Sequence, residues 1–314
     1  MCIRDSTSYD PNKEIIVTVG GSEAIDLTIR CLIQPGDEVL IVEPSFVCYR
    51  PIVSLCGGVP VVIETKEENE FRLTADELRE KITDKTKLLV LPYPNNPTGA
   101  IMRREDLEAI AKVLKDTNIM IASDEIYSEL TYSGKHCSIA EIEGMRERTI
   151  VINGFSKSFA MTGWRLGFLG GPKEIVSQML KLHQYAIMSS PTVSQYAAIV
   201  AMHSCQKDID AMRNEYNIRR RFVVDSFNKL GLKCFAPQGA FYVFPCIKST
   251  GMTSTDFCEK LVYTKKVAVV PGDAFGECGE GYVRVSYAYS LNHLREAIKR
   301  IGEFLEDIKN GNVQ

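Results

Sequence analysis

The sequence has no marked excess of charge of either sign. Its 37 lysines and arginines are nearly balanced by 40 aspartates and glutamates, which gives a formal net charge of -3. The basic residues are spread along the chain, whereas proteins that bind nucleic acids or anionic membranes usually carry a basic patch. We therefore expect neither a nucleic acid nor a membrane as partner, and small molecules become the favoured ligands.

Metal-binding and disulfide patterns are also missing. The chain has ten cysteines but only four histidines, no two cysteines are separated by two residues, and the cysteines do not cluster with the histidines. This distribution is typical of reduced, buried thiols rather than of a zinc site or a disulfide framework. It favours the cytoplasm as the compartment.

Long apolar runs are absent as well. No stretch is long enough to cross a bilayer, and residues 1–6 lack the apolar core of a signal peptide. The 314 residues, 45% of them hydrophobic, have the composition of an ordinary globular protein. Their number suits one large domain or two unequal ones.

What the sequence does have is an alternation of short apolar runs with helical patterns. The runs are typical of buried strands, and the segments between them repeat apolar residues at helical spacing. The predicted strands are residues 14–19, 38–42, 59–63, 87–91, 119–122 and 149–152. The alternation predicts an α/β fold with a mainly parallel sheet sandwiched by helices.

The pattern changes after residue 208. A long charged helix is predicted at 212–230 and an amphipathic helix at 291–308. Between them, short strands are predicted at 233–235, 240–244, 267–270 and 282–286. We therefore predict two domains, a large domain over residues 10–211 and a smaller α+β domain over residues 212–314.

Polar residues follow the predicted strands at their carboxyl ends, where α/β sheets collect ligands. Asn96 follows the fourth strand, and Asp124 and Tyr127 follow the fifth. Because Asn96 precedes a proline, its backbone is held extended and its amide can point into a cleft. Plainer interpretations exist, since residues 96–99 make a good turn and Asp124 can be a helix N-cap.

Lys157 occupies a loop between two apolar runs, with Phe155, Phe159 and Met161 as sequence neighbours. Apolar surroundings lower the pKa of an amine toward values at which it acts as a nucleophile or a base. Arg165 follows eight residues later and can fold back toward this loop. Taken singly, the lysine is more often a surface residue packed on aromatic rings, and the arginine an ion-pair partner.

Two further segments are candidates for binding anions. The glycine turn at residues 20–24 joins a strand to a helix, so its free N–H groups can hold a phosphate. The alternative is a plain turn with Ser22 as the N-cap. Arg284 lies on a predicted strand of the second domain, where it either faces the cleft between domains or remains exposed.

Together these segments resemble the class I and II aminotransferases, pyridoxal-phosphate enzymes of fold type I. The matching motifs occur in the family's order and spacing, at residues 20–24, 95–99, 123–127, 156–165 and the strand of Arg284. The resemblance implies an enzyme that uses pyridoxal 5′-phosphate to move an amino group from an L-α-amino acid to a 2-oxo acid. It also implies a homodimer in the full-length form.

The resemblance implies a role for each residue near the cofactor ring. Lys157 holds the cofactor as a Schiff base and then acts as the general base. Asp124 pairs with the pyridine nitrogen and keeps it protonated, which makes the ring an electron sink. Asn96 and Tyr127 donate hydrogen bonds to the 3′ oxygen, and Phe46 stacks on the ring.

The resemblance also implies how the anionic groups are held. Arg284, planar and bidentate, suits the substrate α-carboxylate, with Asn96 beside it. Cis peptides are expected before Pro44 and Pro97. The phosphate is expected on the backbone of Gly21, Ser22, Glu23 and Ala24 and on Arg165 and Ser156, with the Glu23 side chain turned away.

Two departures from the family pattern bear on function. Several tens of residues that the family has before the first strand are absent, so we expect a truncated chain whose site is less fully enclosed. Tyr185 stands near the place where dicarboxylate-specific relatives have an arginine, which favours aromatic or neutral substrates over aspartate. The rival interpretations are a pyridoxal-phosphate C–S β-lyase and a non-catalytic, aminotransferase-like fragment or effector domain.

Overall fold

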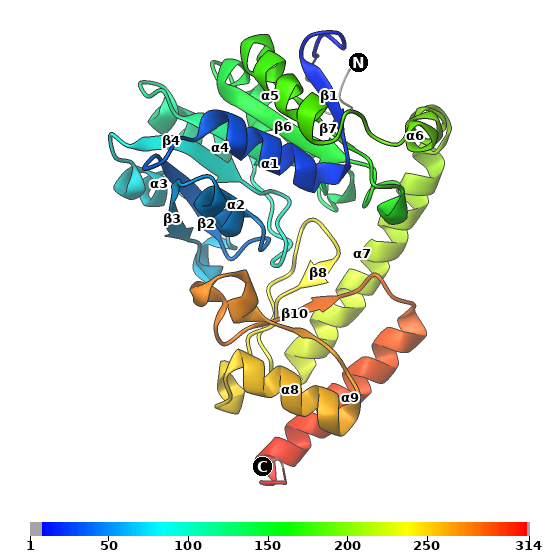
Figure 1. Ribbon diagram of the computed structural model, residues 1–314. Helices are drawn as coiled ribbons and strands as arrows, with labels where there is room; N and C mark the ends of the chain where they lie inside the picture. Colours follow the sequence, from blue (N-terminus) through cyan, green and yellow to red (C-terminus); the bar gives the residue numbers. More distant parts are fainter. Residues whose placement is uncertain (1–7, 313–314) are drawn as a thin grey trace.

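The computed structural model describes residues 8–312, so the prediction about a signal peptide at residues 1–6 lies outside the described range. A seven-stranded sheet dominates one part of the molecule and a three-stranded sheet the other. The long helix α7 (Gln206–Lys229) runs between the two parts (Figure 1). The predicted α/β fold is confirmed.

The large sheet has the strand order β1-β7-β6-β5-β4-β2-β3. Four neighbouring pairs, from β3 through β2, β4 and β5 to β6, are parallel, while β7 is antiparallel to both β6 and β1. The strands are β1 (Ile15–Thr18), β2 (Glu38–Glu43), β3 (Val59–Glu64), β4 (Thr86–Leu91), β5 (Met120–Asp124), β6 (Thr149–Gly154) and β7 (Gly167–Gly170). The sheet is therefore mainly parallel, as predicted.

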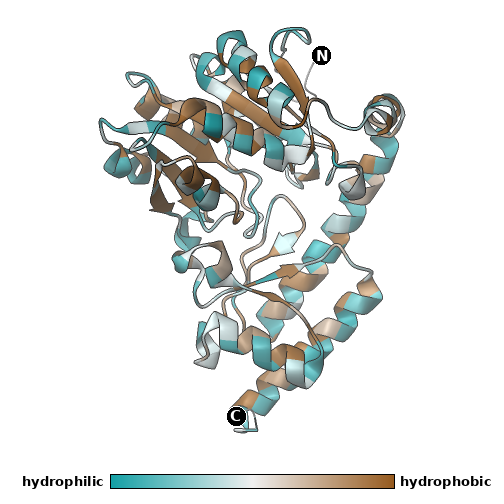
Figure 2. Ribbon diagram, in the orientation of Figure 1, coloured by the Kyte–Doolittle hydropathy of each residue, from teal (hydrophilic) through white to brown (hydrophobic). Residues whose placement is uncertain are grey.

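Both faces of this sheet are covered, because successive strand residues point to opposite sides. Val39 and Ile41 of β2 pack with α1, α2 and α5, whereas Leu40 and Val42 pack with α3 and α4. The helices are α1 (Gly20–Leu32), α2 (Tyr49–Leu55), α3 (Ala75–Lys81), α4 (Arg104–Leu114) and α5 (Lys173–Ala186). Burial on two faces explains the uninterrupted apolar runs, seen as brown strands in Figure 2.

The smaller part has its own core. Its antiparallel sheet has the order β8-β10-β9, and its core residues run from Val223 to Leu305. Its elements, besides α7, are β8 (Tyr242–Val243), α8 (Ser254–Lys265), β9 (Val270–Pro271), β10 (Val283–Ser286) and α9 (Leu291–Lys309); α6 (Thr192–Ser204) precedes α7. We propose that the domains over 10–211 and 212–314 divide inside α7.

The structure of this smaller part differs from the sequence predictions at three points. Residues 233–235 form no strand, because the Cys234 N–H donates 3.0 Å to the side chain of Asn228 at the end of α7. Helix α8 was not predicted; its buried residues are few and Tyr263 on it is 75% exposed. Helix α7 also begins at Gln206, six residues before the predicted start at Met212.

The structure also bears on membrane helices and on disulfides. None of the described helices is both long and apolar enough to cross a bilayer. Nine of the cysteines lie within the described range, and all nine are free thiols.

Candidate active site

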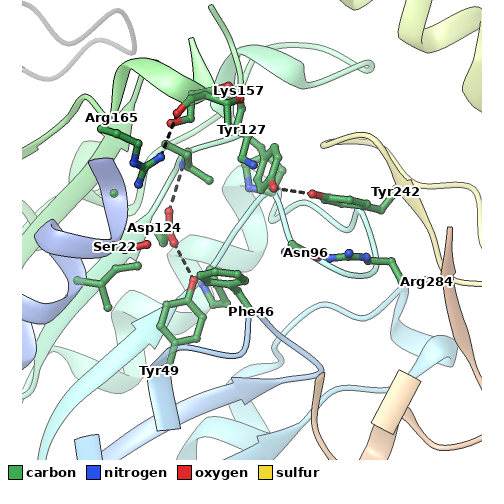
Figure 3. A pocket seen from close by; sticks show the side chains of 17 residues that line it. Ser22, Phe46, Tyr49, Asn96, Asp124, Tyr127, Lys157, Arg165, Tyr242 and Arg284 are labelled. Carbon is green, nitrogen blue, oxygen red and sulfur yellow. Dashed lines mark hydrogen bonds between the residues drawn. The ribbon is translucent and has the colours of Figure 1, made fainter. Parts of the chain in front are cut away.

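A cavity of about 290 Å³ lies between the carboxyl end of the large sheet and strands β8 and β10. Arg165 and Ser22 lie at one end of it and Arg284 at the other, with Lys157 and Asp124 between them (Figure 3). Most of the predicted site residues line this cavity: Gly21, Ser22, Phe46, Asn96, Asp124, Tyr127, Ser156, Lys157, Arg165 and Arg284.

Glu23 and Ala24 do not line the cavity, because the turn of α1 directs them elsewhere. Ala24 is fully buried in the core between α1 and the sheet. The Glu23 carboxylate accepts a hydrogen bond from the N–H of Val19 and lies 2.7 Å from Nδ1 of the buried His183. Ser22 is not the N-cap, because α1 already begins at Gly20.

Lys157 lies on the loop between β6 and β7, and its ammonium is 5.9 Å from the ring centroid of Tyr127 and 5.8 Å from that of Phe241. Burial lowers the pKa of Lys157, and the positive charges of Arg284 and Arg165 lower it further. The carboxylate of Asp124 acts in the opposite direction. The net effect favours a neutral, reactive amine.

The aromatic residues next to the Lys157 amine are not the sequence neighbours Phe155 and Phe159. Phe155 and Met161 belong to a cluster that Ala198 and Ala201 of α6 complete. The rings beside the ammonium belong instead to Tyr127 and Phe241, which are distant from Lys157 in the sequence.

Asp124 ends β5 and is 8% exposed. Burial raises its pKa, while hydrogen bonds to its carboxylate oppose the rise. The Tyr49 hydroxyl donates 2.7 Å to Oδ2, and the Ile126 N–H donates 3.2 Å to Oδ1. Asp124 is not a helix N-cap, because the next helical turn begins at Ser128 and has Tyr127 as its N-cap.

Arg165 packs against the glycine turn rather than against an acid. It adopts a φ of +51°, and Nη1 donates 3.1 Å to the carbonyl of Thr162. No carboxylate within residues 8–312 lies at ion-pair distance from it. A Cβ atom on Gly20 would stand 2.8 Å from Nη2 of this arginine, so a larger residue there would displace the guanidinium.

Arg284 extends from β10 across the cavity. Its Nη1 donates 2.8 Å to Oδ1 of Asn96, and its guanidinium carbon lies 4.5 Å from the ring centroid of Tyr242 and 4.8 Å from that of Phe275. Its Nε is buried and has no hydrogen-bond partner among the described residues. A buried donor of this kind is suited to an anionic ligand.

Tyr127 and several unpredicted residues complete the cavity. The hydroxyl of Tyr127 lies 3.0 Å from that of Tyr242, and burial raises the pKa of Tyr127 well above its ordinary value. Tyr49, Thr162 and Tyr242 were not predicted. The local sequence gave no signal for either tyrosine.

The peptides before Pro44 and Pro97 are cis, as expected from the resemblance. A third cis peptide, before Pro94, was not predicted. All three lie in loops that border the cavity.

The donor set fits pyridoxal phosphate. N–H groups at the start of α1 with Arg165 match a phosphate, and the acid Asp124 matches a ring nitrogen that carries a proton. Lys157 matches an aldehyde, and the unpartnered Nε of Arg284 matches the carboxylate of an amino acid. Each charge therefore has a complementary group on the cofactor or its substrate.

Comparison with known proteins gives a consistent result. The family model of aminotransferase class I and II matches residues 4–301. The chain is 48% identical to a putative aminotransferase, YugH, of Bacillus subtilis, covering 96% of this chain and 78% of YugH. It is 48% identical to the aspartate aminotransferase of Pyrococcus abyssi, covering 98% of this chain and 79% of the relative.

A solved structure agrees with these sequence relatives. The aromatic aminotransferase of Pyrococcus horikoshii superposes with a TM-score of 0.95 at 45% identity, over 98% of this chain and 82% of that one.

Proposed function

Because the chain belongs to the class I and II aminotransferase family, we propose that the cavity around Lys157 is where it carries out its reaction. The enzyme transfers an amino group from an amino acid to a 2-oxo acid and uses pyridoxal phosphate. The aminotransferase names of its relatives favour this reaction over β-elimination and over a non-catalytic role. The observation that carries the proposal is that Lys157 and Asp124, from neighbouring strand ends, line one cavity.

The cofactor ring is held by residues of the large domain. Asp124 would pair with the ring nitrogen and favour its protonated form, and Phe46 would stack on the ring. Asn96 and Tyr127 would donate hydrogen bonds to the ring oxygen. Tyr49 fixes the carboxylate of Asp124 through their 2.7 Å hydrogen bond, so the acid keeps one orientation.

The phosphate is held at the other end of the cavity. The N–H groups of Gly21 and Ser22 point from the start of α1, where the helix dipole favours an anion. Arg165 and Ser156 add side-chain donors. Glu23 contributes no side chain, because its carboxylate is engaged with His183 and Val19.

Lys157 moves the proton of the reaction. When bound, pyridoxal phosphate supplies an electron sink for the negative charge that develops at the substrate Cα. The Nζ of Lys157, whose lowered pKa favours the neutral form, removes the proton from that Cα. The rings of Tyr127 and Phe241, with centroids 5.9 and 5.8 Å from Nζ, give the amine apolar neighbours.

The substrate class follows from the charges of the cavity. Arg284 binds the α-carboxylate, Arg165 the phosphate, and Lys157 takes part in the chemistry; no fourth cation lines the cavity among the described residues. Tyr185 is 92% exposed and outside the cavity. We therefore propose neutral and aromatic amino acids, rather than aspartate, as preferred donors.

Steady-state kinetics with 2-oxoglutarate as acceptor test this preference. We expect kcat/KM to be at least tenfold higher for phenylalanine and tyrosine than for aspartate, because the second carboxylate of aspartate meets no free cation. A preference for aspartate would contradict the substrate class while leaving amino transfer intact. Release of pyruvate and ammonia from cystathionine, without need for a 2-oxo acid, would contradict amino transfer itself.

We propose that the enzyme is a homodimer in the cytoplasm. Helix α6 exposes apolar side chains on one surface: Val193 is 68% exposed, Tyr196 69%, Ile199 53% and Val200 62%. Apolar patches of this kind are typical of protein interfaces. The free thiols of the described cysteines support a reducing compartment.

A further inference from the structure

Tyr242 links two parts of the cavity that belong to different domains. It lies on β8 and is 6% exposed. Its hydroxyl is 3.0 Å from the hydroxyl of Tyr127, and its ring lies 4.5 Å from the guanidinium carbon of Arg284. One side chain therefore touches both the phenol at the cofactor ring and the arginine at the substrate carboxylate.

The contact between the two hydroxyls raises the question of which phenol donates the shared hydrogen bond. Two phenols 3.0 Å apart share one hydrogen bond, so one of them donates and the other keeps its proton for a different acceptor. Burial raises the pKa of both phenols, so both stay protonated near neutral pH. If the Tyr242 hydroxyl donates to the oxygen of Tyr127, the hydroxyl proton of Tyr127 is available for a ligand in the cavity. The two successive hydrogen bonds polarise each other, which strengthens donation by Tyr127.

The contact between the Tyr242 ring and Arg284 restricts the orientation of the guanidinium. Arg284 would otherwise be a long side chain with several rotamers, but the rings of Tyr242 and Phe275 lie on it at 4.5 and 4.8 Å. A guanidinium is attracted to an aromatic face by the ring quadrupole. Its hydrogen bond to Asn96 fixes one nitrogen, and the buried Nε has no hydrogen-bond partner among the described residues.

We propose that Tyr242 is a positioning residue with two separable parts: its hydroxyl donates to Tyr127, and its ring holds Arg284 flat with Nε toward the substrate carboxylate. The ring part rests on the proposed function of Arg284. Phe241, the sequence neighbour, does neither, because its ring lies beside Lys157 and Tyr127 instead.

Two substitutions separate these parts in the holoenzyme. Tyr242→Phe removes the hydroxyl and keeps the ring, whereas Tyr242→Met removes the ring and retains apolar volume. Tyr287→Phe is the matched control, because Tyr287 is a fully buried small-domain tyrosine whose hydroxyl donates 3.2 Å to the carbonyl of Ala240, outside the cavity. It loses a buried hydrogen bond of similar size without touching either partner of Tyr242.

The proposed role of the Tyr242 hydroxyl is tested by following the visible absorbance of the bound cofactor as a function of pH and measuring the midpoint of the transition. For Tyr242→Phe we expect the midpoint to move to higher pH by about 0.5 unit, because weaker donation by Tyr127 stabilises the deprotonated ring oxygen less. The Tyr287→Phe titration should superimpose on that of the wild type. A Tyr242→Phe midpoint equal to the wild type, or lower, overturns the hydroxyl part.

The ring part is read from the dissociation constant of 3-phenylpropionate, a carboxylate without an amine, with 3-phenylpropanamide as the uncharged comparison. We expect Tyr242→Met to weaken the carboxylate about tenfold and Tyr242→Phe to change it less than twofold. The amide should bind all variants alike. Unchanged carboxylate affinity in folded Tyr242→Met overturns the ring part.

Arg284→Gln distinguishes this inference from the function on which it rests. If the glutamine variant loses 3-phenylpropionate binding by about a hundredfold but Tyr242→Met does not, only the positioning proposal fails. If the glutamine variant binds 3-phenylpropionate as the wild type does, the proposed role of Arg284 fails. Should Tyr242→Met not fold, Tyr242→Leu measures the same loss of ring.

Discussion

Lys157 has two arginines near its amine. Burial and the charges of Arg284 and Arg165 lower its pKa, and Asp124 offsets only part of this. In the folded protein without cofactor, the protonated form of Lys157 is therefore destabilised relative to the unfolded chain. Active sites often keep such destabilising groups because their reactivity depends on them.

We predict that Lys157→Met raises the melting temperature of the cofactor-free protein by a few degrees. The folded-state pKa of Lys157 lies below the ordinary 10.5, so between the two values the unfolded chain binds more protons and stability rises with pH. The gain from the substitution should thus be largest below the lowered pKa and shrink toward pH 10.5. Calorimetry at several pH values measures it, and a gain that grows with pH would contradict the account.

A second prediction concerns Tyr49. Tyr49→Phe removes the hydrogen bond to Asp124 and leaves its carboxylate less firmly oriented, so we expect the dissociation constant of pyridoxal phosphate to rise about tenfold. Tyr93→Phe is the control, since the Tyr93 hydroxyl is equally buried but bonds Phe71 and Leu73 outside the cavity. Equal affinity in the two variants would show that the hydroxyl of Tyr49 does not matter.

At the residue scale, the sequence was informative where a motif combined several residue types. Lys157, Asp124 and Asn96 follow strands in recognisable motifs, so their convergence was predictable. Tyr49 and Tyr242 were not, because nothing in their local sequence distinguishes a tyrosine that touches the cavity from one in a core. The Glu23 side chain is turned away from the cavity as expected, but its partner, His183, is 160 residues away in the sequence and was not predicted.

At the scale of elements, a helix with a clear end signal is easier to predict than a short strand. The Thr74 hydroxyl accepts from the N–H of Glu77 in a capping box at the start of α3 (Ala75–Lys81). The strand expected at 233–235 is wrong, and its sequence has no such signal. A short apolar run cannot indicate whether a backbone N–H such as that of Cys234 will bond a neighbouring strand or, as here, the side chain of Asn228.

The turn before α1 gives a prediction at this scale. Gly20→Ala should lower pyridoxal-phosphate affinity at least tenfold, because the added Cβ meets Nη2 of Arg165 at 2.8 Å and displaces the guanidinium. Gly251→Ala is the matched control: both glycines have a positive φ, at +78° and +72°, but nothing lies within 4 Å of a Cβ on Gly251.

Both alanine variants should lose about 1–2 kcal/mol of folding free energy from the left-handed backbone. Only Gly20→Ala should also lose cofactor affinity. Cofactor titration of the two proteins under equal conditions checks this, and equal affinity would contradict the fitted turn.

At the scale of the whole molecule, the cavity depends on how the two domains meet. The Ser45 N–H donates 2.9 Å to the carbonyl of Phe275, and Arg284 reaches Asn96 across the same junction. The order of strands within each sheet follows general rules of α/β folds, but the contacts between domains depend on side-chain shapes that no local pattern encodes. This is why the sequence predicted Arg284 as a site residue but did not predict its hydrogen bond to Asn96.

The exposed surface of α6 leads to a prediction about assembly. Val200→Glu places a charge on this surface, so we expect it to weaken dimer association at least tenfold and to shift the mass found by light scattering toward the monomer. Leu55→Glu is the control, because Leu55 is 78% exposed on α2. If both variants keep the wild-type mass, the dimer does not use α6.

The central claim is that Lys157 performs the chemistry in this cavity. Borohydride reduction of the cofactor-loaded protein, followed by peptide mass spectrometry, tests it most directly. We predict that the reduced pyridoxyl label is found on Lys157 in stoichiometric amount, with the exposed Lys173 unlabelled. A label located on any other lysine, with Lys157 unmodified, would contradict the account.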